Sequence, residues 1–274
     1  MTKFNLHLVS DATGETLVSV AKATLAQFDD AEPVTHLWAM VRSRKQLLET
    51  IAAISETPGL VMFTLVDTGF RRILQEECRQ RQIPCVPVLD PVLRALANFL
   101  GAESLEQPGL QHIMDNAYFD RIDAMHFCMS HDDGQGLADL DQADVVLVGV
   151  SRTSKTPTCI YLANRGIKAA NVPIVPGMPL PPELADVGDV LVVGLTATAD
   201  RLVQIRRNRL LSLNQQPQTD YVEPDLVKDE VTQARRMFTS RGWPVIDVSR
   251  RSIEETAAAI LNLYGRRLEQ AEAQ

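Results

Sequence analysis

Apolar, β-prone runs alternate with helical patterns along most of this chain, and the alternation is the feature that most limits its fold. Within the first hundred residues, segments with apolar residues at helical spacing follow four such runs, at residues 3–10, 35–41, 59–66 and 84–89. The third run is continuously apolar, which is typical of a strand buried on both faces. Strands that alternate with helices in this way favour a parallel sheet with right-handed crossover connections.

A second alternating series contains candidate strands at residues 144–150, 170–175, 189–195 and 243–248. Between the two series, the chain is polar and has weak periodicity, as in a functional loop or a connection between domains. We therefore predict an α/β protein that has two α/β domains with mainly parallel sheets. The predicted parts are an N-terminal domain at residues 1–105, a connecting segment at 106–142 and a nucleotide-binding domain at 143–274.

The composition agrees with a globular protein and excludes several classes. Of the 274 residues, 45% are hydrophobic and 23% are charged, and 27 basic against 35 acidic side chains give a net charge of −8. The negative charge argues against nucleic acid as a partner. The sequence shows no apolar run of the roughly 18 residues that span a membrane, no signal-peptide pattern and no Cys-x-x-Cys pair. We therefore expect a cytoplasmic protein without a nucleic-acid or membrane partner.

The strongest chemical signal is a loop between a buried strand and a helix at residues 149–156. Amide N–H groups at the start of a helix have no partner within the helix and bind anions. Lys155 would reach a terminal phosphate, and the hydroxyl of Thr156 would face a magnesium ion. The predicted nucleotide-binding residues are Gly149, Val150, Ser151, Arg152, Thr153, Ser154, Lys155 and Thr156.

Ser154 departs from the usual phosphate-loop pattern, in which a glycine precedes the lysine. Glycine tolerates a positive φ at that position and lets the backbone approach a phosphate closely, whereas serine does both less well. The alternative is an ordinary strand-to-helix turn that contains Ser-Lys-Thr. The agreement of the strand, the helix and the Lys-Thr pair favours a phosphate loop with a P-loop-like strand-loop-helix arrangement.

Two adjacent aspartates precede the strand that carries this loop, in the sequence His131-Asp132-Asp133-Gly134. No apolar strand that ends in aspartate follows the loop, so a metal-binding carboxylate would come from elsewhere. Asp132 and Asp133 are the candidates, because adjacent carboxylates can serve as a metal ligand and as a general base for a hydroxyl nucleophile. The alternative is a solvated acidic turn.

Three weaker signals leave alternatives open. The turn at residues 10–16 could hold a second phosphate or part of a partner protein, or Thr13 could simply cap the following helix. His126, Cys128 and His131 have a spacing that fits no zinc pattern. A predicted helix at residues 199–213 has basic side chains for which a solvated face is favoured over phosphate binding, namely Arg201, Arg206, Arg207 and Arg209.

Several of these motifs together resemble one family. Residues 149–158, with Tyr161-Leu162-Ala163 and residues 169–173 after them, are similar to the bacterial pyruvate, phosphate dikinase regulatory protein family. The similarity extends to residues 10–16 and 131–134, so it covers nearly the whole chain. A sister branch that acts on phosphoenolpyruvate synthetase usually has Cys-Gly where this chain has Thr153-Ser154, which places the chain in the dikinase branch.

The resemblance implies a bifunctional serine/threonine kinase and phosphorylase. Its kinase activity would use ADP to phosphorylate a threonine beside the catalytic histidine of the dikinase, which inactivates that enzyme. Its second activity would remove the phosphate with inorganic phosphate and release pyrophosphate. With ADP as donor, Lys155 would stabilise charge on the transferred β-phosphate, while Asp132 or Asp133 would act as base and Thr156 would face Mg²⁺.

Other functions remain alternatives at this stage. The same chemistry could act on phosphoenolpyruvate synthetase. A small-metabolite kinase is a second alternative, because the strand at 244–248 and the helix at 252–260 look like the end of nucleoside-type kinases. A nucleotide sensor without catalytic activity is a third, and a homodimer is left open as the oligomeric state.

Overall fold

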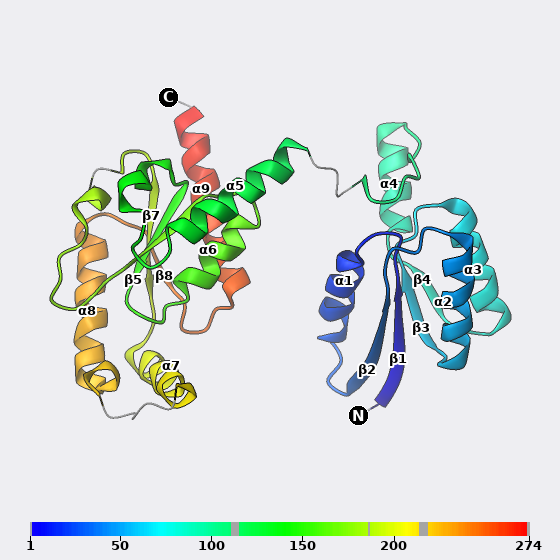
Figure 1. Ribbon diagram of the computed structural model, residues 1–274, viewed down its shortest axis with the longest axis horizontal. Coiled ribbons are helices and arrows are strands. Elements are labelled where there is room, and N and C mark those ends of the chain that lie inside the picture. The colour runs from blue at the N-terminus through cyan, green and yellow to red at the C-terminus, as the bar shows by residue number, and fades with distance from the viewer. Residues whose placement is uncertain (1, 111–114, 186, 214–218, 273–274) are drawn as a thin grey trace. The chain divides into compact units, whose positions relative to one another are not determined.

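The computed structural model describes residues 2–110, 115–185, 187–213 and 219–272. The chain divides into two compact units, Met1–Ile113 and Met114–Gln274. Each unit is built on a four-stranded parallel sheet with helices packed against it (Figure 1). The prediction of an α/β protein with two parallel sheets is therefore confirmed. None of the helices in the described part of the chain combines the length and the apolar character that a membrane span requires.

The first unit alternates four strands with four helices. They are β1 (Thr2–Val9), α1 (Glu15–Leu25), β2 (Ala31–Trp38), α2 (Arg44–Glu56), β3 (Gly59–Phe63), α3 (Thr68–Gln80), β4 (Cys85–Pro87) and α4 (Asp90–Leu100). The strand order is β2-β1-β3-β4, and all neighbouring strands are parallel. Leu47 of α2 and Leu74 of α3 belong to the core on one face of the sheet, and Leu17 of α1 belongs to the core on the other.

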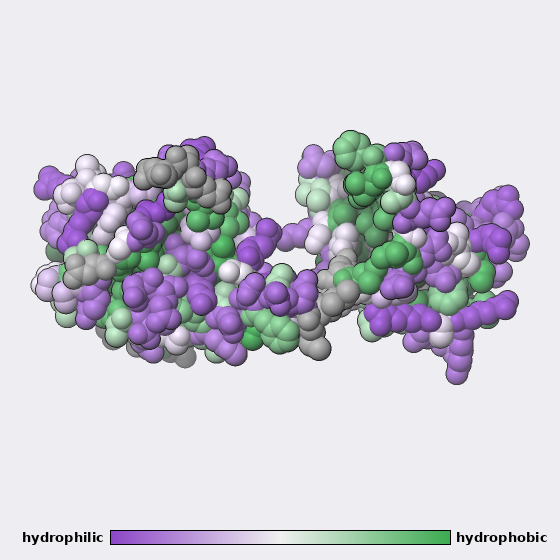
Figure 2. Space-filling model, turned by 90° about the horizontal axis from the view of Figure 1, so that it is seen from above, coloured by the Kyte–Doolittle hydropathy of each residue, from purple (hydrophilic) through white to green (hydrophobic). Residues whose placement is uncertain are grey.

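Helix α4 is the most exposed helix of this unit. None of its residues, all of which lie in the described part of the chain, is buried. Apolar side chains recur at helical spacing along its exposed surface, at Val92, Leu96, Phe99 and Leu100. Figure 2 shows hydrophobic residues gathered on the surface of the first unit. Helix α4 therefore adds apolar area to the surface of the unit rather than to its core.

The second unit repeats this organisation, and its described residues add three short 3₁₀ helices. Its elements are α5 (Asn116–Ser130), η2 (Leu137–Gln142), β5 (Val145–Gly149), α6 (Lys155–Ala163), β6 (Ala169–Pro173), η3 (Pro182–Ala185), β7 (Leu191–Thr196), α7 (Ala199–Ser212), η4 (Asp220–Val222), α8 (Pro224–Ser240), β8 (Val245–Asp247) and α9 (Ile253–Glu272). Side chains of α7 and α8 form the core on one face of the sheet. Helices α5, α6 and α9 lie on the other face (Figure 1), where their side chains form a second core.

Both sheets have the same strand order relative to the chain. The order in the second unit is β6-β5-β7-β8, so the first strand of each unit lies between its second and third strands. In open parallel sheets of this kind, ligands bind outside the carboxyl ends of the strands, where the order reverses. The loops that follow β1 and β5 leave the sheet at this place in their respective units, which makes both of them candidate binding loops.

The predicted connecting segment at 106–142 differs from the structure. Residues 111–114, which include His112, lie outside the described residues, but the fifteen-residue helix α5 and the 3₁₀ helix η2 occupy much of the rest. Only Ala124, Phe127 and Cys128 of α5 are buried. Because this apolar stripe is narrow, the helical period in the sequence is weak.

Candidate functional site

The loop between β5 and α6 lies at the carboxyl end of a central strand. It begins at Gly149, where a Cβ atom would lie 2.6 Å from the carbonyl oxygen of Leu195 and 2.8 Å from Oγ1 of Thr153. Contacts this close are not tolerated, so only glycine fits beside β7 at this position. Thr153 is buried, and its hydroxyl donates to the carbonyl oxygen of Val150 at 2.9 Å, which closes the loop on itself.

Two residues of the loop adopt the left-handed conformation. Arg152 has a φ of 73° and Ser154 has a φ of 59°. Ser154 therefore takes the conformation for which a glycine would be favoured, at a cost of roughly 1–2 kcal/mol for a residue with a Cβ atom. Its side chain makes no capping hydrogen bond to α6, which begins at Lys155. Because the start of α6 lacks a side-chain cap, its first amide groups are suited to an anion.

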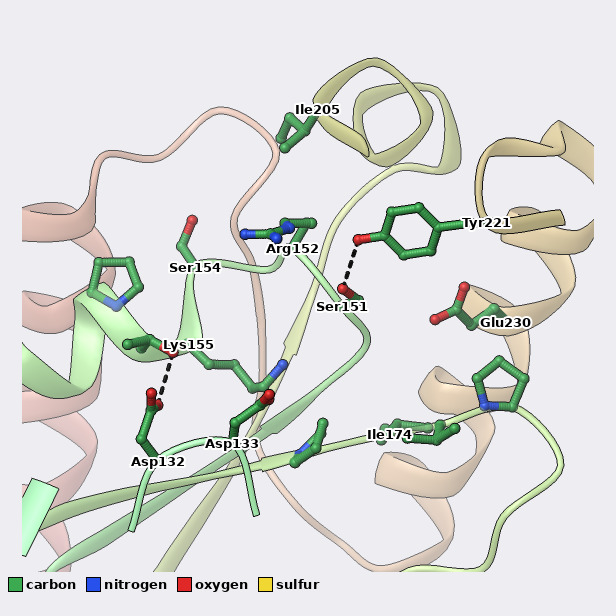
Figure 3. Close-up of a pocket in the computed structure, with 15 residues that line it drawn as sticks. Asp132, Asp133, Ser151, Arg152, Ser154, Lys155, Ile174, Ile205, Tyr221 and Glu230 are labelled. Carbon is green, nitrogen blue, oxygen red and sulfur yellow. Dashed lines mark hydrogen bonds between the residues drawn. The ribbon is translucent and has the colours of Figure 1, made fainter. Parts of the chain in front are cut away.

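Lys155 is buried, and its side chain lies across the loop. Its Nζ donates to the carbonyl oxygens of Gly149 at 2.9 Å and Val150 at 3.1 Å. Burial lowers the pKa of Lys155 to about 8, although the nearby carboxylate of Asp133 opposes the shift. Figure 3 shows the ammonium group directed toward Asp133. The loop thus holds a desolvated ammonium group, which an incoming phosphate anion could stabilise.

The lowered pKa of Lys155 predicts a pH dependence of anion binding. As pH rises through about 8, the ammonium group of the free protein loses its proton, so its contribution to pyrophosphate binding should decline. A bound anion favours the protonated form, so binding near pH 8–9 should take up a proton, which calorimetry in buffers of different ionisation enthalpy measures. Pyrophosphate itself titrates, so Lys155→Met is the matched control. An identical pH dependence in both proteins would contradict the prediction.

Asp132 lies beside the other functional side chain of the loop, Thr156. The hydroxyl of Thr156 donates to Oδ1 of Asp132 at 2.8 Å. Nδ2 of Asn171, on β6, donates to the same carboxylate oxygen and lies 3.2 Å from Oγ1 of Thr156. The structure therefore brings together the carboxylate and the hydroxyl that the sequence suggested as metal-binding groups, and adds Asn171, which the site prediction did not include.

Asp133 occupies a different position from its neighbour. Its φ is 53°, which is left-handed, and its backbone N–H donates to Oδ1 of Asn171 at 3.2 Å. This backbone conformation turns its side chain into the cavity beside Lys155 (Figure 3). Asp132 is thus held by hydrogen bonds at the edge of the loop, whereas the side chain of Asp133 faces the cavity.

These residues line a cavity of about 660 Å³ in the second unit. This volume falls within the range typical of small-molecule sites. Its floor is formed by the loop and the two aspartates, and its walls come from the segment after β6, from α7, from η4 and from α8. The lining residues are Asp132, Asp133, Ser151, Arg152, Ser154, Lys155, Thr156, Pro157, Pro173, Ile174, Val175, Pro176, Ile205, Tyr221 and Glu230.

Arg206 corrects the prediction of a wholly solvated basic helix. Arg201, Arg207 and Arg209 are exposed as expected, but Arg206 is 1% exposed. It donates to both carboxylate oxygens of Glu230, at 2.8 and 2.9 Å. The solvated-face prediction was wrong for Arg206 because α8 supplies a partly buried carboxylate, Glu230, that the local sequence does not reveal.

Arg206 and Glu230 also support one side of the loop at residues 149–156. The guanidinium group donates to the carbonyl oxygen of Ser151 at 3.1 Å and lies 4.6 Å from the ring of Tyr221. The hydroxyl groups of Ser151 and Tyr221 share a hydrogen bond of 2.9 Å (Figure 3). Because Arg206 pairs with Glu230, the carboxylate in the cavity wall is compensated and repels an anion less.

The weaker sequence signals have different outcomes. His126 is exposed while Cys128 and His131 are buried, and the described residues contain no group of histidine, cysteine and acidic side chains suited to a metal ion. The ring of His131 stacks on Phe127 instead, at 3.7 Å between centroids. In the first unit, Gly14 and not Thr13 is the cap position of α1. The loop at 10–16 contributes to a separate cavity of about 290 Å³.

Comparison with known proteins finds similar sequences over nearly the whole chain. The family model described as kinase/pyrophosphorylase matches residues 6–261. Proteins with the name pyruvate, phosphate dikinase regulatory protein are similar over nearly the full length. The relative from Paramagnetospirillum magneticum is 58% identical over 269 residues, which cover 98% of this chain and 86% of the relative. The relative from Caulobacter vibrioides is 56% identical over 262 residues, which cover 96% of this chain and 83% of the relative. The relative from Rhizorhabdus wittichii is 54% identical over 273 residues, which cover 100% of both chains.

Proposed function

Because this chain belongs to the kinase/pyrophosphorylase family, we propose that it is a cytoplasmic, bifunctional regulator of pyruvate, phosphate dikinase. In this proposal it phosphorylates a threonine of the dikinase with ADP as donor, and it removes that phosphate with inorganic phosphate. The names of the relatives support the dikinase as target. The observation that supports the proposal is that one cavity is lined by the predicted phosphate loop, by Lys155 and by a carboxylate that lies beside the ammonium group of that lysine.

The phosphate loop accounts for the use of a diphosphate donor. The β-phosphate of ADP would replace the loop carbonyls as the hydrogen-bond partner of Lys155. The backbone N–H groups at the start of α6 would donate hydrogen bonds to its oxygens. In the transition state, negative charge develops on the transferred group, and a fixed ammonium group in a site of low dielectric constant stabilises it. AMP would be the leaving group.

The threonine hydroxyl of the target has to lose a proton as it attacks the β-phosphorus. The new bond joins the threonine oxygen to that phosphorus, and the bond to the bridging oxygen of ADP breaks. Asp133 is the better candidate for the base, because it faces the cavity, whereas Oδ1 of Asp132 already accepts from Thr156 and Asn171. Asp132 remains the alternative base.

Thr156 and Asp132 are suited to a magnesium ion. They present a hydroxyl and a carboxylate oxygen 2.8 Å apart, and Mg²⁺ prefers such hard oxygen ligands. When bound there, the ion would neutralise charge on the phosphates. The residues of this chain would supply the remaining contacts, with Lys155 and the loop amides on the phosphate oxygens.

In the second activity, inorganic phosphate attacks the phosphorus of the phosphothreonine. A bond forms between a phosphate oxygen and that phosphorus, the bond to the threonine oxygen breaks, and pyrophosphate and threonine are released. The nucleophile is already an anion, so Lys155 and the loop amides would hold it in position. The leaving threonine oxygen takes up a proton, which the carboxyl group of Asp133 or water can donate.

A labelling experiment tests the proposal. The purified chain is incubated with pyruvate, phosphate dikinase and its ligands and with ADP labelled in the β-phosphate, and the phosphorylated residue is mapped. We expect labelled phosphothreonine in the dikinase with AMP as product, and loss of the label as pyrophosphate when phosphate is added. Phosphoenolpyruvate synthetase is the control substrate. Transfer from ATP to a small molecule without a protein would indicate a metabolite kinase, and binding without turnover would indicate a sensor.

A further inference from the structure

Asn171 connects the two halves of the candidate site. It lies in the middle of β6, pairs with Leu147 of β5 and is 1% exposed. Its side-chain amide has three partners: Nδ2 donates to Asp132 and to Thr156, and Oδ1 accepts the backbone N–H of Asp133. Because both the NH₂ group and the oxygen of this buried amide form hydrogen bonds, the amide fixes the orientation of the groups that it contacts.

The backbone of Asn171 holds the same segment. Its N–H donates to the carbonyl oxygen of His131 at 3.1 Å, and its carbonyl oxygen accepts the N–H of Gly134 at 2.9 Å. One residue of β6 therefore binds the segment 131–134 at each of its four positions. The segment is anchored to the sheet that also carries the phosphate loop, so the aspartates and Lys155 are held in one rigid frame.

Asp133 depends most on this anchor. Its left-handed backbone is unfavourable for a residue with a Cβ atom and persists only where the surroundings hold it. The hydrogen bond from its N–H to Oδ1 of Asn171 is one such constraint, and the neighbouring bond from Nδ2 keeps Asp132 on Thr156. Without the amide, both carboxylates could turn, and Asp133 could leave the position beside Lys155.

We infer that Asn171 is a positioning residue for the phosphoryl transfer, which sets Asp133 toward the acceptor hydroxyl and holds Asp132 against Thr156. The inference rests on the proposed kinase function. It assigns Asn171 no contact with substrate. Its effect on the rate comes entirely through the two aspartates, because a displacement of about 1 Å can lower a rate by about 100-fold.

A double-mutant cycle tests the inference. We expect Asn171→Ala to lower the kcat of ADP-dependent transfer by about 10- to 100-fold, with a much smaller change in the KM for ADP. When Asp133 is already replaced by asparagine, Asn171→Ala should lower kcat by a clearly smaller factor than in the unchanged protein, because only its effect through Asp132 remains. When one residue acts through another, the effects of the two substitutions on the activation free energy are not additive.

Val172→Ala is the matched control. Val172 is the next residue of β6 and is also buried in the core, and its apolar side chain cannot form hydrogen bonds to the aspartates, so its truncation destabilises the same strand without removing such a bond. We expect Val172→Ala to lower the melting temperature but to leave kcat close to that of the unchanged protein. Its effect on kcat should be equally small in the unchanged protein and in the Asp133→Asn variant. If Asn171→Ala does not fold, Asn171→Ser replaces it, since its hydroxyl keeps a polar group on β6 but is shorter than the amide.

The outcomes separate the inference from the function on which it rests. A normal kcat in a folded Asn171 variant overturns the positioning role, and an equal loss with and without Asp133→Asn overturns the positioning of Asp133 by Asn171; in both cases the kinase function stands. An unchanged rate in Asp133→Asn alone rejects that residue as base and, with it, the route by which Asn171 acts. If the unchanged protein transfers no phosphate from ADP, the proposed function itself fails.

Discussion

Replacing Asp133 by asparagine should lower the rate of ADP-dependent phosphorylation by about 10²- to 10⁴-fold, which is the usual loss when a general base is removed. Asparagine has nearly the same shape, and the backbone N–H that donates to Asn171 is unchanged, so the loop should keep its conformation. ADP affinity should therefore change little. Single-turnover kinetics with the dikinase, together with a titration of ADP, measure the two quantities separately.

Asp132→Asn provides the comparison for this prediction. Asp132 accepts hydrogen bonds from Thr156 and Asn171, and an asparagine would bring its own amide group close to that of Asn171. If Asp132 holds a magnesium ion, its replacement should raise the magnesium concentration needed for half-maximal activity, which Asp133→Asn should not do. The assignment fails if Asp133→Asn retains a normal kinase rate, or if it loses activity only because ADP no longer binds.

The strand and helix on either side of the predicted phosphate loop could be predicted from the sequence because the pattern is local. A buried strand, a short turn and a helix that starts at Lys155 follow one another in the chain, and Gly149 and the Lys-Thr pair mark the ends of the loop. Ser154 departs from the glycine of the usual pattern, and the structure shows a left-handed backbone there despite the side chain. The strand-helix alternation likewise predicted two parallel sheets, since each run is short and strongly apolar.

The remaining parts of the site depend on contacts between distant segments. Asn171 is a polar residue inside an apolar strand, which is a signal in the sequence, but its partners lie 15 to 39 residues away. In the sequence, Arg206 is indistinguishable from its exposed basic neighbours, because its partner Glu230 lies 24 residues later in the chain. The different orientations of Asp132 and Asp133 follow from the backbone of a loop and from Asn171. The sequence therefore predicts both aspartates as candidates, but it does not show which is the base and which is the metal ligand.

The replacement of Lys155 by alanine should abolish most of the kinase activity without unfolding the protein. Lys155 is the first residue of α6, where alanine is the best helix former. The change also removes a buried ammonium group whose pKa is lowered to about 8 by desolvation, so the melting temperature should not fall substantially. We expect the rate of ADP-dependent transfer to fall by at least about 10²-fold, the effect of losing one preorganised charge-stabilising donor.

Nucleotide binding should reveal which phosphate Lys155 contacts. AMP has no β-phosphate, so Lys155→Ala should weaken AMP binding much less than ADP binding. Lys155→Arg should also be a poor kinase, because a planar guanidinium group is not a compact ammonium group and the loop around Nζ is tight, with carbonyl oxygens at 2.9 and 3.1 Å. Near-normal turnover in Lys155→Ala would mean that residues 149–156 are only a turn and that the phosphate site lies elsewhere, with the loop at residues 10–16 as the next candidate. A loss that a thermal melt explains entirely by unfolding would equally defeat the assignment, because the charge of Lys155 would then serve the fold rather than the transferred phosphate.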